Sequence, residues 1–148
     1  MALMNKGVEI LTNRMPKVVS PRTHAILDYA TAAGFFIGAA LFWRNHKRAA
    51  IASLACGVAE TATALMTDFP GGVTDVISFP THGRIDAGLA AGLQTLPSVV
   101  GFGGDAQAWF FRAQGASIAA VTGLTDFGAG ESWRERERRI GRRDRHIA

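Results

Sequence analysis

Cysteine is nearly absent from this 148-residue sequence, which contains Cys56 alone. A single cysteine excludes a disulfide framework within the chain and leaves the redox compartment open. The first 19 residues also lack the apolar run and the small-residue cleavage site of a secretory signal peptide, so none is predicted there.

Charged side chains are nearly absent from four long apolar stretches. These stretches contain 19, 18, 18 and 19 residues, close to the roughly 20 that a helix needs to cross a bilayer. They are Ala25–Trp43, Ala49–Met66, Ile85–Phe102 and Ala106–Leu124. A water-soluble bundle needs a polar stripe along every helix, and the sequence has none. We therefore predict four transmembrane helices, the first starting at an N-cap Ser20 followed by Pro21.

An internal repeat divides this helical region in two. Aligning residues 20–72 with residues 78–130 without gaps matches 15 of 53 positions, where composition alone would give roughly four. The prediction is an all-α, polytopic membrane four-helix bundle made of two tandemly duplicated helical hairpins, repeat 1 (20–72) and repeat 2 (78–130). An amphipathic or disordered leader (1–19) would precede this transmembrane domain (20–130), and a basic cytoplasmic tail (131–148) would follow it.

Glycine pairs within the apolar stretches indicate how the helices pack. Gly34 and Gly38 lie four residues apart, as do Gly88 and Gly92. Such small-residue pairs are typical of close helix contacts in membranes. Both pairs are therefore predicted at helix interfaces.

The basic residues predict the orientation in the membrane. Twelve of the 16 Lys and Arg residues lie in the terminal segments or beside the starts of the first and third helices. Arg44, Lys47 and Arg48 occupy the opposite turn. The positive-inside rule then places both termini in the cytoplasm, with the protein in the cell inner membrane. A net charge of +4 beside apolar stretches indicates anionic lipids rather than nucleic acid as partners. Association of the chain into a homo-oligomer is a further possible partner interaction.

A pair of ionisable residues occurs at the start of each repeat. His24 and Asp28 recur 58 residues later as His82 and Asp86. Residues four apart lie on one face of a helix, so each pair presents an imidazole and a carboxylate together.

A second pair of carboxylates is predicted near the same level of the bundle. Asp68 lies as far from the turn at His46 as His24 does, 22 residues. Asp126 lies as far from the turn at Gly104 as His82 does, again 22 residues. Six candidate ligands should therefore meet near the cytoplasmic face: His24, Asp28, Asp68, His82, Asp86 and Asp126.

Two histidines with four carboxylates suit one or two divalent ions, Zn, Fe or Mn, in a helical bundle. The ion would offset the cost of carboxylates in a membrane, and a metal-dependent membrane enzyme is one use of it. The alternative to a ligand set is two pairs of hydrogen-bonded helix ends, since Thr and Asp readily terminate helices.

Three further residues are secondary candidates. Glu60 lies inside the second stretch, where it is interpreted as a salt-bridge partner of Arg112, or else as a ligand or proton relay. Tyr29, beside Asp28, is a candidate donor to a metal ligand or an interfacial aromatic residue.

Two other function classes remain. In a cation or proton transporter or channel subunit, the carboxylates would bind the ion in transit, and Glu60 with Arg112 would extend a polar path. In a haem electron carrier, His24 and His82 would be the axial ligands, although a macrocycle would bury the neighbouring aspartates.

The stretch from His82 to Phe102 carries a resemblance to a known family. It combines His82 and Asp86 with Pro97 and a Gly101-Phe102 pair, and in this order it resembles bacterial SPW-repeat membrane proteins. The first repeat lacks the proline, and Val99 stands where that family has tryptophan. The resemblance implies a small bacterial integral membrane protein and assigns no chemistry.

Overall fold

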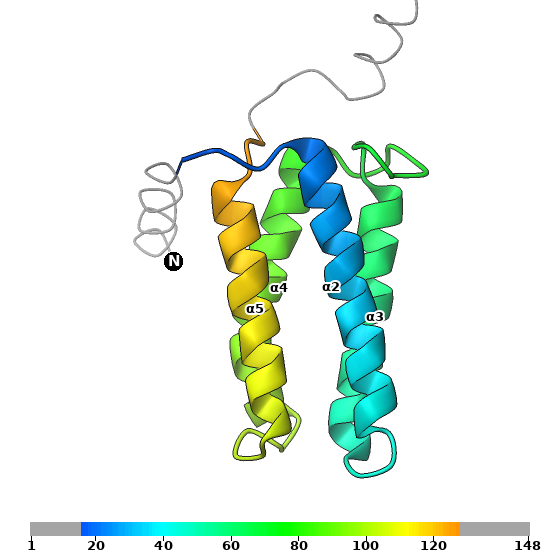
Figure 1. Cartoon of the computed structure of the whole chain (residues 1–148), viewed down its shortest axis with the longest axis vertical. Coiled ribbons are helices and arrows are strands. Elements are labelled where there is room, and N and C mark those ends of the chain that lie inside the picture. The colour runs from blue at the N-terminus through cyan, green and yellow to red at the C-terminus, as the bar shows by residue number, and fades with distance from the viewer. Residues whose placement is uncertain (1–15, 128–148) are drawn as a thin grey trace, which may run out of the picture.

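The computed structural model describes residues 16–127, which form four helices and, within that range, no strand. The predicted leader and tail lie outside the described residues, apart from positions 16–19. The helices run alternately up and down in one bundle (Figure 1). They are α2 (Pro21–Phe42), α3 (Lys47–Met66), α4 (Phe79–Val99) and α5 (Gln107–Leu124). The all-helical class is thereby confirmed.

Helix α2 begins with the predicted N-cap, and α4 begins with an N-cap of the same kind. The Ser20 side chain accepts a hydrogen bond from the backbone N–H of Thr23 at 3.2 Å, and Pro21 follows it at the first helical position. Ser78 caps α4 in the same way through Thr81, at 3.4 Å. Both caps satisfy backbone donors that have no partner within the helix.

Helices α3 and α5 end on the side of the bundle where α2 and α4 begin. Each of these two ends is hydrogen-bonded by the segment that precedes the other hairpin. The Val19 N–H donates to the carbonyl of Leu124 at 3.0 Å, and the Ile77 N–H donates to the carbonyl of Met66 at 2.9 Å. Each bond adjoins an isolated bridge, Val19 with Thr125 and Thr67 with Ile77. The start of each hairpin is therefore tied to the end of the other.

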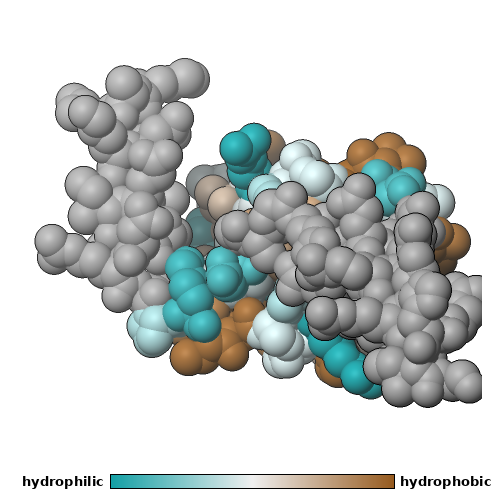
Figure 2. Space-filling view, turned by 90° about the horizontal axis from the view of Figure 1, so that it is seen from above, coloured by the Kyte–Doolittle hydropathy of each residue, from teal (hydrophilic) through white to brown (hydrophobic). Residues whose placement is uncertain are grey.

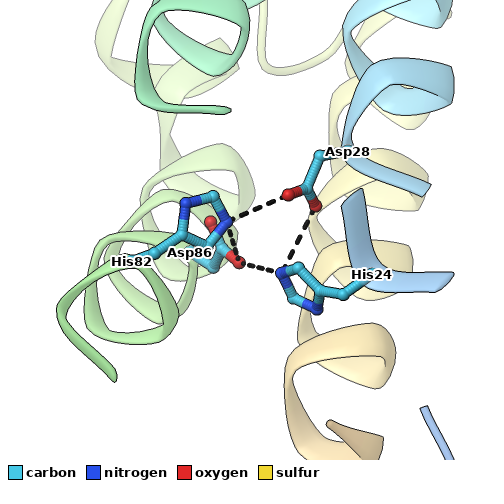
Figure 3. A group of neighbouring side chains, drawn as sticks. All are labelled: His24, Asp28, His82 and Asp86. Atoms are coloured by element: carbon cyan, nitrogen blue, oxygen red, sulfur yellow. Dashed lines mark hydrogen bonds and ion pairs between the residues drawn. The ribbon is translucent and has the colours of Figure 1, made fainter. Parts of the chain in front are cut away.

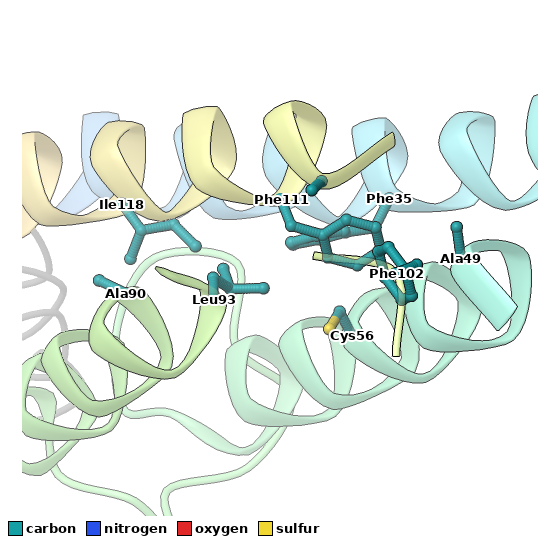
Figure 4. Close-up of a cluster of buried hydrophobic side chains, with 9 residues drawn as sticks. Phe35, Ala49, Cys56, Ala90, Leu93, Phe102, Phe111 and Ile118 are labelled. Atoms are coloured by element: carbon teal, nitrogen blue, oxygen red, sulfur yellow. The ribbon is translucent and has the colours of Figure 1, made fainter. Parts of the chain in front are cut away.

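An apolar core fills the middle and the far end of the bundle (Figure 4). Phe35, Leu93, Phe102 and Phe111 are its largest members and are almost fully buried. Aromatic rings there meet edge to face or tilted, as Phe35 does with Phe110 at 5.8 Å. Away from the end where α2 and α4 begin, this apolar core holds the two hairpins together.

Only two of the four helices are long and apolar enough to cross a membrane, α2 and α3. Buried residues make up 33% of the apolar stretch of α2 and 39% of that of α3, so most residues of both stretches are at least partly exposed. Polar residues such as Arg84 and Gln94 lower the hydropathy of α4, and Arg112 and Gln114 lower that of α5. In the view from the end where α2 and α4 begin, hydrophilic residues lie among hydrophobic residues that emerge at the edges (Figure 2).

The glycine pairs behave differently in the two hairpins. A Cβ at Gly38 would come within 2.7 Å of the Phe110 ring, and one at Gly34 within 2.7 Å of Gln114. At Gly88 and Gly92 a Cβ would meet nothing within 4 Å. The prediction of an interface is therefore wrong for the second pair, because these glycines face away from the other helices.

Close packing in the second hairpin occurs at Gly115 instead, where a Cβ would lie 2.8 Å from the backbone carbonyl oxygen of Ala90. Because a backbone atom cannot rotate away, Gly115→Ala should lower the free energy of unfolding by about 1–3 kcal/mol. Gly92→Ala, in the same hairpin, should be neutral or stabilising by up to about 1 kcal/mol, since alanine is the better helix former. Thermal unfolding of the two variants in the same detergent measures the difference, and equal melting temperatures would contradict this packing.

Candidate metal centre

Four buried side chains from α2 and α4 meet at the polar end of the bundle (Figure 3). His24 and Asp28 lie one turn apart on α2, and His82 and Asp86 lie one turn apart on α4. Their exposed fractions are only 0%, 5%, 0% and 2%. The spacing of four residues puts each pair on one helix face, and the bundle turns the two faces toward each other.

The ligand atoms of these side chains alternate around a ring. His24 Nε2 lies 3.4 Å from Asp28 Oδ1 and 3.1 Å from Asp86 Oδ2. His82 Nε2 lies 3.0 Å from Asp28 Oδ2 and 3.2 Å from Asp86 Oδ2. Each imidazole nitrogen thus faces one carboxylate of its own helix and one of the other helix.

Threonine hydroxyls set the orientation of both imidazoles. His24 Nδ1 lies 2.8 Å from Thr125 Oγ1, and His82 Nδ1 lies 2.8 Å from Thr67 Oγ1. Each hydroxyl donates its own proton to the backbone carbonyl four residues earlier, at 2.7 Å. The hydroxyl oxygen must therefore accept from the ring, so both histidines carry a proton on Nδ1 and present Nε2 to the carboxylates.

These threonines are part of the site, although the sequence did not predict them. Asp68 and Asp126 were the residues predicted from the repeated Thr-Asp-Phe segments, whereas the preceding Thr67 and Thr125 contact the cluster. Both threonines are C-caps with extended backbone and are fully buried. Their identical positions in the two repeats were the available signal.

Phenylalanine rings surround the imidazoles on the side of the helix starts. His24 packs against Phe79 at 5.4 Å and against Phe127 at 5.3 Å, in both cases edge to face. His82 packs against Phe69 at 5.2 Å. These rings keep water from the imidazoles, so the polar atoms of the cluster depend on one another for partners.

Three atoms of the cluster lack a hydrogen-bond partner among the described residues: Asp28 Oδ2, His82 Nε2 and Asp86 Oδ1. The first two are only 3.0 Å apart, yet their alignment does not make a hydrogen bond. Buried polar atoms that are not satisfied by hydrogen bonds can coordinate a metal ion instead. Leaving such atoms unsatisfied costs about 1–3 kcal/mol each.

A four-coordinate ion fits this ring of atoms. Ligands at the usual Zn–N and Zn–O distances of about 2.0–2.2 Å are roughly 3.3–3.6 Å apart in a tetrahedron. The four nitrogen–oxygen separations of 3.0–3.4 Å are close to this range, and one ligand atom from each residue lies within 4.8 Å of the others. The Nδ1–H bonds to threonine match the second hydrogen bond that metal-ligating histidines usually make.

A small cavity lies on the side of the cluster that faces α5. Its volume is about 10 Å³, at the lower limit for one water molecule. Asp28, Asp86, Thr31 and Thr122 contribute to its lining. Three polar atoms without a hydrogen-bond partner among the described residues, Asp28 Oδ2, Asp86 Oδ1 and Thr122 Oγ1, belong to these lining residues.

The remaining two predicted ligands are not part of the four-residue group. Asp68 is buried at the end of α3, where its N–H donates to the carbonyl of Ile77 at 2.9 Å. Asp126 is exposed after the end of α5. The preceding residues, Thr67 and Thr125, contact the histidines, but residues beyond a C-cap no longer follow the helix face.

The secondary candidates have separate environments. Tyr29 donates to the carbonyl of Gly71 at 2.7 Å. Arg112 donates to the carbonyl of Gly103 at 3.2 Å and lies over the Trp109 ring. The salt bridge expected between Glu60 and Arg112 is wrong, because no ion pair joins them in the part of the chain that the structure describes.

Glu60 itself is 3% exposed, on α3. Its carboxyl group lies within electrostatic range of Asp28, Asp86 and His82. Glu60 is therefore a further ionisable group beside the four ring residues.

Comparisons of the chain with protein-family models, curated proteins and solved structures found no match.

Replacing either threonine should destabilise the protein. Thr67→Val or Thr125→Val leaves a buried Nδ1–H without an acceptor, which should lower the free energy of unfolding by about 1–3 kcal/mol. Thr61→Val is the matched control, because that hydroxyl bonds the Gly57 carbonyl of its own helix, and its effect should stay within about 0.5 kcal/mol. Chemical denaturation compares the three variants, and equal losses would show that the histidine contacts contribute nothing.

Proposed function

We propose that this protein is an integral membrane protein that binds one divalent transition-metal ion between α2 and α4. The ligands are His24 Nε2, His82 Nε2 and the carboxylates of Asp28 and Asp86. The observation that carries the proposal is the convergence of these four donors at 3.0–3.4 Å, with both Nδ1 atoms bonded to threonine.

Charge balance supports a bound cation. Two carboxylates at 5% exposure or less would cost on the order of several kcal/mol each if left uncompensated. A divalent ion with two neutral imidazoles and two carboxylates is a neutral unit. Without the ion, both imidazoles must carry an extra proton to give the same balance.

The donor set favours certain metals. Imidazole nitrogen with carboxylate oxygen suits Zn, Fe and Mn, whereas Mg and Ca prefer oxygen alone and Cu(I) prefers sulfur. Of the three, Zn²⁺ is the ion most commonly held by four protein ligands. The single-ion proposal uses four of the six ligands predicted from the sequence.

Metal-dependent hydrolysis is the catalytic use that the surroundings favour. The cavity beside Asp86 and Thr122 is large enough for one water molecule next to the metal ligands. A metal ion held there would lower the pKa of a bound water, and Asp86 Oδ1, which has no hydrogen-bond partner among the described residues, would accept its proton. Catalysis would need this water to reach the metal.

The two competing functions have weaker support. A haem between His24 and His82 would need the space that Asp28 and Asp86 occupy, since both carboxylates lie within 3.4 Å of the Nε2 atoms. A polar path for cations was expected to include an ion pair between Glu60 and Arg112. Within residues 16–127 the structure has no such pair. Cation transport by the buried carboxylates stays the second candidate.

Membrane insertion of all four helices is supported by the distribution of apolar side chains. Large hydrophobic residues are exposed on every helix, among them Ile37 (60%), Ile51 (57%) and Trp109 (70%). Exposed apolar surface of this extent is typical of lipid contact. In the proposed topology the protein spans a bacterial inner membrane, as the SPW-repeat resemblance suggests. Both termini face the cytoplasm, as the distribution of basic residues suggests.

Removing the metal should lower stability, because an ion that binds only the folded state shifts unfolding by mass action. Chelation should therefore lower the melting temperature by several degrees. His24→Ala and Asp86→Asn should each lose stoichiometric metal, with affinity reduced about 100-fold or more. Elemental analysis and thermal unfolding of the purified full chain measure both effects.

Two variants control this experiment. His46→Ala should keep the metal, because His46 pairs with Asp105 at the opposite end of the bundle. Asp126→Asn should also keep it, and loss of metal there would instead support the six-ligand site predicted from the sequence. Failure to bind Zn²⁺, Fe²⁺ or Mn²⁺ at one ion per chain would overturn the metal proposal and leave the cluster as a structural hydrogen-bond network.

Cysteine labelling tests the topology. In a Cys56→Ala background, Asn45→Cys in the turn between α2 and α3 should react with an impermeant maleimide added to intact cells. Thr74→Cys, in the loop between α3 and α4, should react only after lysis. The opposite pattern would invert the orientation, and recovery of the protein in the soluble fraction would refute membrane insertion.

A further inference from the structure

An apolar groove runs along the bundle between α3 and α4, whereas residues of α2, α4 and α5 line the small cavity beside Thr122. Its volume is about 540 Å³, within the range of small-ligand sites. Its walls are the side chains of Ile51, Ala52, Ala55, Cys56 and Ala59 on α3, with Leu89, Leu96 and Val100 on α4. None of the metal ligands contributes to it, so the groove is a separate feature of the molecule.

The length and the apolar lining of the groove suit one hydrocarbon chain. The α3 wall extends from Arg48 to Ala59, which is roughly 16 Å at about 1.5 Å per residue. Three alanines keep this wall low, whereas Leu89 and Leu96 form the opposite side. Every side chain along its length is apolar except the one at the end.

Arg48 is that exception, and it lies at the mouth of the groove. Its Nη1 donates to the carbonyl of Gly101 at 3.3 Å, so the guanidinium reaches from α3 to the segment that follows α4. A guanidinium has five N–H donors, and this is the one hydrogen bond it makes within the described range. The remaining donors suit a phosphate, which arginine binds in a bidentate manner.

Charge at this end of the bundle also favours an anion. Arg44 and Lys47 lie within four residues of Arg48 in the sequence. The acidic residue of the neighbouring turn, Asp105, is paired with His46 at 2.8 Å. A phosphate at Arg48 would therefore meet a basic surface, which is the arrangement that attracts anionic lipids.

We propose that this groove binds one acyl chain of an anionic phospholipid, with the lipid phosphate at Arg48 and the chain along α3 and α4. The inference rests on the proposed membrane location and is independent of the metal. The chain would end beside Ala59 and Leu89, and Leu89 lies three residues after the metal ligand Asp86. The lipid would thus close the open side of the bundle between the two hairpins.

Photo-crosslinking of the full chain in lipid nanodiscs tests the proposal. The probe is phosphatidylglycerol with a diazirine on one acyl chain, in a phosphatidylcholine bilayer, compared with phosphatidylcholine bearing the same diazirine. Peptides that contain Ala55, Cys56 or Leu89 should be labelled several-fold more by the phosphatidylglycerol probe. Arg48→Gln should remove this preference, whereas Arg44→Gln, which deletes the same charge outside the groove, should keep it.

A second variant fills the groove without touching the charge. Ala55 is exposed on α3 and lines the groove, so Ala55→Phe should fold normally and should abolish labelling of these peptides by both probes. Equal labelling by the two lipids in the unmodified protein would overturn the proposal. So would protein–protein crosslinks through the same peptides in place of lipid adducts, because a second copy would then occupy the groove.

The experiment separates this proposal from the membrane proposal. If the outward faces of α2 and α3 are labelled without preference and the groove peptides are not, the protein is in the bilayer and only the lipid site is wrong. If the chain does not enter nanodiscs, the membrane location itself fails, and the lipid site fails with it.

Discussion

Two imidazoles and two carboxylates buried at one level of the bundle impose the strictest constraint on this structure. An unpaired carboxylate in such surroundings is costly, so the four groups must face one another or a shared cation. Each histidine contacts the aspartate of its own helix and that of the other helix at 3.0–3.4 Å. The cluster is therefore also the polar connection between the two hairpins.

The exchange of contacts between hairpins continues outward from the cluster. The histidine of α2 bonds the threonine that ends α5, and the histidine of α4 bonds the threonine that ends α3. The backbone around these threonines is held in turn by the segment before the other hairpin. These paired bonds occur at positions 58 residues apart, which supports the proposed duplication. The threonines act as positioning residues, since they orient the rings without facing the shared centre.

The two ends of the bundle have different chemistry. Buried polar groups with aromatic neighbours gather where α2 and α4 begin, whereas the far half is an apolar core with an apolar groove beside it. This separation lets a water-excluding helix bundle hold a charged centre at one level and offer a hydrocarbon surface elsewhere. A metal-activated water and a lipid chain would then be accommodated by different walls of the same small protein.

Much of this organisation could be predicted from the residues alone. Apolar stretches separated by Pro and Gly residues predict the four helices. The His-x-x-x-Asp spacing predicts that His24 and Asp28 share one helix face, as do His82 and Asp86. Both predictions succeed because helix periodicity is a local property of the sequence. Contacts between helices depend on rotation about each axis, which no local pattern specifies. The tertiary structure therefore decided that Thr67 and Thr125, rather than the adjacent aspartates, reach the histidines, that Gly92 faces outward, and that Arg112 bonds Gly103 instead of Glu60.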